Sequence, residues 1–320
     1  MEAWKRDLND RGLSWIDVVL AADDNFSLPL AVALLSVISS LREGIGVRAH
    51  ILNMGITPAN RAKITTAADR PNAQVNWVDT LAGHVSHLPN TWKSITRATY
   101  ARLFITDVLP ADVSRALYLD CDVLVRRSVH ELVTSDMGGH AALGVADAGS
   151  PFVCSHYGVP WWFRNGRRAD EPNFNAGVIA MDLDVWRQED YGKQCLEYLA
   201  DGRHEVAQDQ EAINSILGNR IGTVDPRWNV QSELYQREFE MTLPYGPELI
   251  EQMKNDPWIV HFSTQTKPWS YGCDNPYAGE WAALLDQTPY RGTRPSLAKH
   301  LWTRGRRIPR WALDQLHRPA

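Results

Sequence analysis

The amino-acid sequence predicts an α/β protein with a doubly wound, Rossmann-like and mostly parallel sheet that is flanked by helices. Short, almost wholly apolar runs, typical of strands buried on both faces, alternate with segments that carry helical signals. This gives a βαβαβ pattern over about the first 80 residues, as parallel sheets require. Several of the runs end in acidic residues, at the edge where open α/β sheets bind their ligands.

Local signals support the expected elements. The first strand is apolar apart from Asp17, and Ser27 and Pro29 suit the cap and first turn of the next helix. Thr57 and Pro58 open the second helix in the same way. The expected strands cover residues 16–22, 47–52, 75–78, 116–119, 142–145, 178–181 and 259–261. The expected helices cover residues 28–41, a segment opening at 57–58, 95–108, 185–199 and 208–217.

Bulk composition excludes several classes of protein. The chain has 320 residues, of which 44% are apolar and 22% charged, as in a folded globular domain. A net charge of −5 argues against a nucleic-acid partner. The four cysteines form no CxxC pair, which fits a reducing cytosol. No apolar signal core or run of roughly 18 apolar residues is present, so a cytoplasmic location is expected.

Acidic residues recur just after the expected strands. If the sheet is parallel, the strand ends meet at one edge, so these carboxylates are expected to converge on a ligand site. The alternative for any one of them is an ordinary helix cap or turn. The residues concerned are Asp23, Asp24, Asp79, Asp120, Asp122 and Asp147.

The segment Asp120-Cys121-Asp122 is the most specific of these features, because apolar strand sequence flanks it on both sides. In an extended segment, residues i and i+2 face the same side, so both carboxylates can reach one cation while Cys121 points into the protein. Two carboxylates with open coordination positions suit Mg²⁺ or Mn²⁺ shared with a diphosphate.

Six segments in the same order resemble the family 8 glycosyltransferases. They are residues 16–24 (IDVVLAADD), 95–103 (ITRATYARL), 115–125 (RALYLDCDVLV), 173–186 (NFNAGVIAMDLDVW), 208–214 (QDQEAIN) and 260–269 (VHFSTQTKPW). The resemblance runs from about residue 16 to residue 286 and is closest to bacterial lipopolysaccharide-type galactosyl- and glucosyltransferases, with glycogenin more distant. It implies a GT-A fold, a UDP-sugar donor, Mn²⁺, with Mg²⁺ as the alternative, and retention of anomeric configuration.

The resemblance also implies roles for single residues. A uridine pocket would include Ala21, Asp23 and Asn25, and the donor would further contact Arg102, Cys121 and Lys267. The metal would be held by Asp120, Asp122 and His261. On an apolar strand, His261 alone is more often a core histidine, but Lys267 beside a diphosphate would stabilise the leaving group and favours the site.

The donor sugar would be recognised by Asp147, Asn175, Ala176, Asp209 and Gln210. The Asn-Ala-Gly segment from 175 to 177 also fits an ordinary turn, and an acid such as Asp209 also suits a helix start. For catalysis, Gln210 matches the family position that stabilises developing positive charge. An amide is a poor nucleophile, so front-face departure and attack is preferred, with Asp209 as the alternative stabiliser or nucleophile.

The sequence departs from close relatives in two places. Thr264 and Gln265 stand where those relatives have a glycine before the lysine, which changes the expected backbone approach to the pyrophosphate. The region 148–172 also differs from relatives and is expected to border the acceptor, and it contains the long loop expected over residues 151–172. Its His156, Trp161 and Trp162 either stack on a sugar ring or form a small core of the loop itself.

A glycosyltransferase domain is expected over residues 1–290, followed by a basic, helical tail over 291–320. The tail has eight Lys or Arg and one acidic residue, Asp314, so it carries +7 and leaves −12 for the rest. Its basic residues alternate with Trp302, Ile308 and Trp311, which suits an anionic membrane surface. The alternative is a helix that packs on the domain with a solvated basic face.

These observations predict a retaining, Mn²⁺-dependent transferase that moves galactose or glucose from a UDP-hexose. The acceptor would be a saccharide or lipid-linked saccharide, as in lipopolysaccharide biosynthesis, and the protein would be peripheral on the inner membrane face. The alternatives are a nucleotide-sugar hydrolase, a self-glycosylating glycogenin-like protein and a non-catalytic module with a decayed site.

Overall fold

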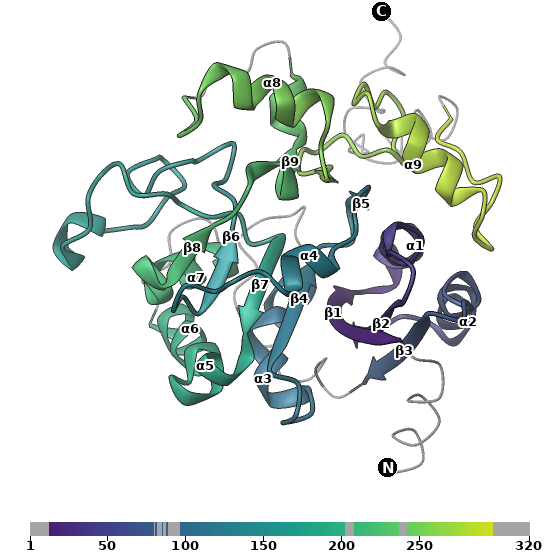
Figure 1. Ribbon diagram of the computed structural model, residues 1–320, viewed down its shortest axis with the longest axis horizontal. Helices are drawn as coiled ribbons and strands as arrows, with labels where there is room; N and C mark the ends of the chain where they lie inside the picture. The colour runs from purple at the N-terminus through teal and green to yellow at the C-terminus, as the bar shows by residue number, and fades with distance from the viewer. Residues whose placement is uncertain are drawn as a thin grey trace, which may run out of the picture.

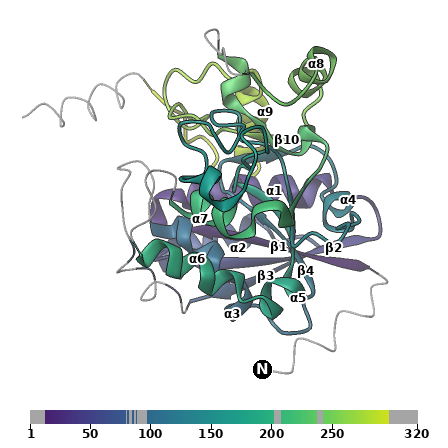
Figure 2. The same cartoon turned by 90° about the vertical axis from the view of Figure 1, so that its left-hand side faces the viewer.

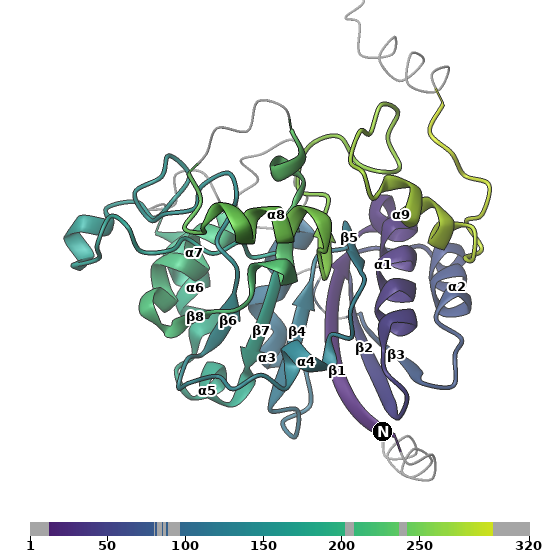
Figure 3. The ribbon, with the colours of Figure 1, turned by 45° about the horizontal axis from the view of Figure 1, so that its top comes forward.

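The computed structural model describes residues 13–79, 81, 85, 88, 97–201, 208–236 and 242–296, and the fold is a mixed α/β sheet flanked by helices. The main sheet has the order β3-β2-β1-β4-β7-β6-β8 (Figure 3). Its strands are β1 (Ser14–Ala22), β2 (Ile45–Asn53), β3 (Ala73–Val78), β4 (Arg115–Leu119), β6 (Ala142–Gly144), β7 (Val178–Asp182) and β8 (Ile221–Thr223). Every pairing is parallel except those of β7 with β4 and β6, so the prediction of a mostly parallel sheet is confirmed.

Helices cover both faces of this sheet (Figures 1 and 2). One face packs on α1 (Ser27–Ser40) and α2 (Pro58–Ala67), with α9 (Ala278–Leu285) beyond them. The other face packs on α5 (Leu183–Gln188), α6 (Tyr191–Ala200) and α7 (Gln208–Leu217). The remaining helices are α3 (Ile105–Val108), α4 (His130–Val133) and α8 (Pro247–Asn255).

A second, three-stranded sheet of order β5-β10-β9 lies on the α1 side and was not expected. Its strands are β5 (Val123–Val125), β9 (Val230–Gln231) and β10 (Ile259–His261). The chain leaves the main sheet at the end of β4, turns through Asp120 to Asp122 and enters this second sheet as β5. In the antiparallel pairing of β10 with β5, His261 lies opposite Val123. The corner therefore brings His261 next to the two aspartates.

Three local predictions were wrong. Ser27 is the first residue of α1 rather than its cap, and its hydroxyl donates to the Asp24 carbonyl. The expected helix over 95–108 is a 3₁₀ helix over Arg97–Phe104 followed by the short α3, while residues 95 and 96 lie outside the described part. In that turn the Arg102 side chain donates to the Thr99 carbonyl, an acceptor that a regular α-helix would use.

The third error is the single helix over 185–199, which is two helices, α5 and α6. The break falls at Asp190, whose backbone is left-handed with φ of 51°. At Gly192 a side chain would place a Cβ 2.3 Å from the Leu103 carbonyl oxygen. The close approach of α6 to that carbonyl explains why the chain bends where the apolar pattern continues.

Candidate active site

A cleft of about 520 Å³ opens at the carboxyl ends of β1 and β4. It is also lined by the loop after β6, the segment before β7 and the start of α7. The expected site residues that line it are Ala21, Asp23, Arg102, Asp120, Cys121, Asp122, Asp147, Asn175, Ala176, Asp209, Gln210, His261 and Lys267. Asn25 is exposed, is not among these lining residues, and donates its backbone N–H to Asp23.

The strand-end acids separate into two groups. Asp23, Asp120, Asp122 and Asp147 line the cleft, as the convergence argument predicts. Asp24 instead accepts three hydrogen bonds at the start of α2. The donors are the Thr57 backbone N–H, the Thr57 hydroxyl and the Asn60 side-chain amide. Asp79 pairs with Asn53 and Arg61. Asp24 thus binds the start of a helix, as the alternative interpretation predicts, and Asp79 binds side chains of neighbouring elements.

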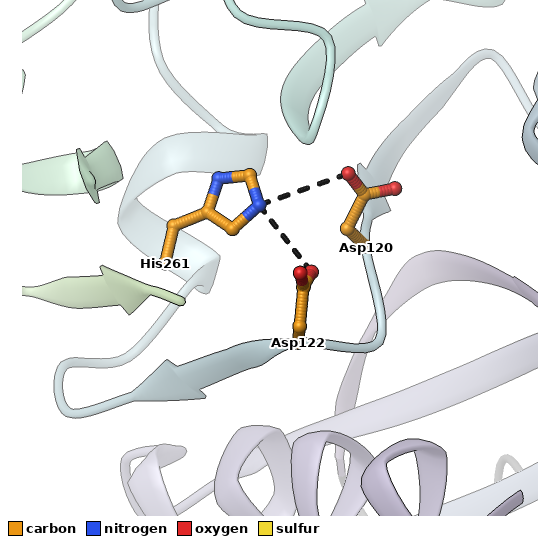
Figure 4. Close-up of side chains that lie close together, drawn as sticks. All are labelled: Asp120, Asp122 and His261. Carbon is orange, nitrogen blue, oxygen red and sulfur yellow. Dashed lines mark ion pairs between the residues drawn. The ribbon is translucent and has the colours of Figure 1, made fainter. Parts of the chain in front are cut away.

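Asp120, Asp122 and His261 offer ligand atoms that all lie within 4.8 Å of one another. His261 Nε2 is 3.3 Å from Asp122 Oδ1 and 3.8 Å from Asp120 Oδ2, and Figure 4 shows this nitrogen turned toward both carboxylates. Two carboxylate oxygens and one imidazole nitrogen fit a divalent cation such as Mn²⁺. The three residues could therefore hold a metal, with coordination positions left for a second ligand.

The aspartates lie in the turn between β4 and β5 rather than in one extended strand. Cys121 between them is buried, as predicted, and its thiol donates to the Ala21 carbonyl oxygen over 3.2 Å. This contact fixes the turn against the end of β1. Burial raises the pKa of the Cys121 thiol, so the thiol stays protonated.

Lys267 and His261 set the charge of Asp122. Lys267 Nζ lies 2.6 Å from Asp122 Oδ2 and also donates to the Phe262 carbonyl. Burial alone would raise the pKa of Asp122, but Lys267 and His261 hold it well below its usual range. Burial likewise opposes the charged form of His261, yet the nearby Asp122 carboxylate raises its pKa. The cluster thus keeps Asp122 ionised.

Arg102 connects the metal side of the cleft with the sugar side. Its guanidinium donates to Asp120 Oδ1 over 2.8 Å, forms an ion pair with Asp209 Oδ2 over 2.9 Å, and also contacts the Ala176 carbonyl. Burial would lower the pKa of Arg102, but the two carboxylates raise it, so the side chain is a fixed positive charge. Arg102 is therefore a buried cation that holds the Asp120 and Asp209 carboxylates in position.

Four of the five residues expected at the sugar, Asp147, Asn175, Ala176 and Gln210, form one hydrogen-bonded group, whereas Asp209 has other partners. Gln210 accepts from the Ala176 backbone N–H at 3.0 Å and donates to Asp147 at 3.1 Å. Asn175 donates to the same Asp147 carboxylate oxygen at 2.9 Å. Asp209 is 4% exposed, accepts from the Thr99 hydroxyl and forms an ion pair with Arg102. Burial raises the pKa of Asp209, although Arg102 and Thr99 act in the opposite direction.

The glycine that follows Asn175 and Ala176 has a steric role beside the metal site. A Cβ at Gly177 would lie 2.4 Å from His261 Cε1 and 2.6 Å from Asp120 Oδ2. The sequence suggested that this segment approaches a sugar, whereas the close approach of Gly177 is to the metal-binding side chains.

Sequence analysis missed several residues that line the cleft: Phe26, Thr99, Tyr118, Ser150, Tyr157, Glu233 and Ser263. Tyr118 carried a signal, because it lies two residues before Asp120 on a strand, and its hydroxyl donates to Asp120 Oδ1. Glu233 and Ser263 are bonded to each other across two loops, which no local pattern indicates.

The predicted aromatic residues of the 151–172 loop are not among the described residues that line the cleft. Trp161 is 48% exposed and packs edge-on against Phe163, with Arg164 stacked on its ring. His156 is exposed and packs on Tyr157, which does line the cleft. The loop thus gathers aromatic side chains at the surface rather than around a buried core. Thr264 and Gln265, the two departures, both line the cleft.

The chain is similar to known proteins in both sequence and fold. General stress protein A of Bacillus subtilis is 24% identical over 277 residues, which are 85% of this chain and 94% of that protein. Lipopolysaccharide 1,3-galactosyltransferase of Salmonella typhimurium is 26% identical over 264 residues, 79% of this chain and 72% of that protein. The crystal structure of galactosyltransferase LgtC with donor and acceptor sugar analogues has a TM-score of 0.71 and 29% identity, covering 86% of this chain and 96% of LgtC.

The fold is accordingly the GT-A fold of these glycosyltransferases. The model of the family described as glycosyl transferase family 8 matches residues 17–273. This match spans both sheets and every metal-binding candidate described above. The chain belongs to glycosyl transferase family 8.

Proposed function

We propose that this protein transfers galactose or glucose from a UDP-sugar to a saccharide or lipid-linked saccharide acceptor, with Mn²⁺ and with retention of anomeric configuration. The protein is a hexosyltransferase by its family and its likeness to galactosyltransferases. The observation that carries the finer proposal is the set of Asp120, Asp122 and His261 beside Lys267. That set would hold one divalent cation next to a diphosphate, and Lys267 adds one ammonium beside it.

In this proposal, the leaving UDP is stabilised from two sides. Asp120, Asp122 and His261 would hold a cation, which supplies positive charge to the diphosphate as the sugar departs. Lys267 turns from Asp122 to donate to a phosphate oxygen in the same step. Ala21 in β1 and Asp23 just after it line the cleft and would contact the uridine.

The proposed retaining step uses Gln210 and Asp209 without a covalent intermediate. Both ends of the Gln210 amide are held, by Ala176 and by Asp147, so its oxygen keeps a fixed position. Asp209 is paired with Arg102 and Thr99, which suits an electrostatic stabiliser better than a nucleophile. We therefore propose that the acceptor hydroxyl attacks from the face that UDP leaves.

The direct test is Asp122→Ala, assayed for Mn²⁺-dependent release of UDP from UDP-galactose and UDP-glucose. Loss of turnover with an unchanged circular dichroism spectrum is expected. Asp184→Ala, which removes a carboxylate from the exposed face of α5, is the control and should keep full activity. Activity of the Asp122 variant equal to wild type, or wild-type activity in chelator, would contradict the metal role.

The acceptor decides between a transferase, a hydrolase and a self-glycosylating protein. Tyr157 is an exposed tyrosine that lines the cleft, which gives the self-glycosylating alternative a specific candidate. An increase in intact mass by one hexose after incubation with UDP-sugar, absent from Tyr157→Phe, would establish it. UDP release that is not stimulated by any saccharide would favour hydrolysis instead.

We further propose that the basic tail attaches the enzyme to the inner face of an anionic membrane, near a lipid-linked acceptor. The residues beyond 296 lie outside the described part of the structure. Among the described residues, no helix has the length and apolar character needed to cross a bilayer. Deleting residues 291–320 should abolish binding to phosphatidylglycerol vesicles while UDP-sugar turnover persists. Unchanged vesicle binding would refute the attachment.

A further inference from the structure

Asn229 lies behind His261, outside the cleft lining. It ends the 3₁₀ turn Pro226–Asn229, immediately before β9, which pairs with β10. The residue is 1% exposed, so its side-chain amide must find its partners inside the protein. Those partners are His261 on the metal side and Asn175 on the sugar side.

A backbone N–H can only donate, and this determines which atoms donate and which accept in the hydrogen bonds that join Asn175, Asn229 and His261. Gly177 donates its N–H to Asn175 Oδ1 over 3.0 Å, so that oxygen is an acceptor. Asn229 Nδ2 can then donate to the same oxygen, 2.9 Å away. This leaves Asn229 Oδ1 facing His261 Nδ1 at 3.0 Å, and the ring nitrogen must carry the hydrogen.

The opposite orientation of the Asn229 amide is excluded by the same contacts. It would place the amide oxygen against Asn175 Oδ1, which already accepts from Gly177. Asn175 itself cannot turn over, because its Nδ2 donates to the Asp147 carboxylate at 2.9 Å. The orientation of the Asn175 amide is thus fixed at both ends. The Gly177 N–H fixes its oxygen as an acceptor, and the Asp147 carboxylate fixes its nitrogen as a donor.

We infer that Asn229 is a positioning residue that fixes the His261 ring with Nδ1 as donor and leaves Nε2 to coordinate the metal. A metal-binding histidine needs such a partner on its other nitrogen, which sets the tautomer and the ring orientation. Figure 4 shows Nε2 turned toward Asp120 and Asp122 and the second nitrogen turned away from them.

The same amide couples the metal to the donor sugar. Asn175, which receives the Asn229 hydrogen bond, also contacts Gln210 at 3.3 Å and shares Asp147 with it. A displacement of His261 toward a cation would therefore act on the residues proposed for the sugar through a single buried side chain. This inference rests on the proposed metal site but not on the identity of sugar or acceptor.

Mn²⁺ binding in the presence of UDP, measured by calorimetry without turnover, tests the inference. Asn229→Leu keeps the volume but cannot accept from Nδ1, and we expect Mn²⁺ affinity about 10–100-fold weaker. Asn229→Asp keeps an acceptor for Nδ1 but places a carboxylate oxygen against Asn175 Oδ1. We expect it to retain Mn²⁺ affinity and the nitrogen coupling of bound His261 in pulsed electron paramagnetic resonance, while UDP-galactose and UDP-glucose bind more weakly.

Asn275→Leu is the matched control. It removes another buried amide, one that contacts Ser232 and the Tyr277 backbone, and it should leave Mn²⁺ affinity unchanged. Wild-type Mn²⁺ affinity in Asn229→Leu, or equal losses in the Leu and Asp variants, would overturn the inference. If the Leu variant does not fold, loss of Mn²⁺ affinity in Asn229→Asp overturns it. Failure of the wild-type protein to bind Mn²⁺ with UDP would instead refute the proposed function.

Discussion

The Lys267 ammonium lies 2.6 Å from Asp122 Oδ2. The side chain that we propose binds the diphosphate is therefore paired with one of the two carboxylates that we propose bind the metal. A cation and this ammonium compete for Asp122 until a diphosphate gives Lys267 another partner. We expect Lys267→Met to bind Mn²⁺ alone more tightly than wild type, because the competing charge is gone. The same variant should bind UDP at saturating Mn²⁺ at least tenfold more weakly, since a charged hydrogen bond contributes about 1.5–3 kcal/mol.

The tighter Mn²⁺ binding and the weaker UDP binding of Lys267→Met can both be measured by calorimetry. Because the two changes have opposite signs, the prediction is specific. A variant that is merely misfolded would bind Mn²⁺ and UDP less tightly. Weaker Mn²⁺ binding by well-folded Lys267→Met would therefore count against competition at Asp122.

Gly177→Ala should damage the metal site without unfolding the protein. Its methyl group would lie 2.4 Å from His261 Cε1 and 2.6 Å from Asp120 Oδ2, so one of the two side chains has to move. We expect Mn²⁺-dependent UDP release to fall at least tenfold, since misplacement by about 1 Å can cost 100-fold. Gly246→Ala is the control, because that position has φ of −69° and open space around its Cβ. Equal activity of both variants would exclude the steric role.

Neighbouring variants at 209 and 210 should have different effects. Asp209→Asn removes one of the two acids that balance Arg102, so Arg102 interacts more strongly with Asp120. We expect weaker Mn²⁺ binding as a result. Gln210→Leu removes contacts to Ala176 and Asp147 and should lower kcat while Mn²⁺ affinity stays near wild type. If both variants bound Mn²⁺ with the same affinity, Asp209 and Gln210 would not have the separate roles proposed for them.

Asp17 provides a pH-dependent contribution to stability that is separate from the active site. This buried carboxylate on β1 binds Arg48 and His50, and although burial opposes the charge, both partners lower its pKa from 3.8. Because the folded pKa is lower than the unfolded one, the contribution is complete above about pH 4 and is lost as the pH falls through the folded value.

Asp17→Asn should therefore cost about 3 kcal/mol of unfolding free energy at pH 7. The difference from wild type should shrink as the pH falls below 3.8, which urea denaturation at a series of pH values can measure. Asp136→Asn, at an exposed turn, should show little difference at any pH. A constant difference for Asp17→Asn would mean that packing, not charge, stabilises the site.

His261 ends an apolar strand, where a histidine is more often part of the core, and the family resemblance is what assigned it to the metal. Asp120 and Asp122 could be predicted from the residues themselves because their signal is local, a pair of carboxylates directly after an apolar strand. The cap residue Thr57 was predicted for the same reason, and its hydroxyl accepts from the Asn60 backbone. Such features depend on a few consecutive residues and on strand order.

Other features depend on contacts that no local pattern carries. Asp23 and Asp24 are adjacent, yet one lines the cleft and the other binds the start of α2. Gly192 looks like any helical glycine until the Leu103 carbonyl is found beside it. Asn229 has no signal, since its role appears only when His261 and Asn175 are seen on either side of it.

The three candidate metal ligands come from distant parts of the chain, because Asp120 and Asp122 precede β5 whereas His261 ends β10. They come together through the pairing of β10 with β5. A change that breaks this pairing would therefore separate His261 from the two aspartates even where the main sheet stays intact.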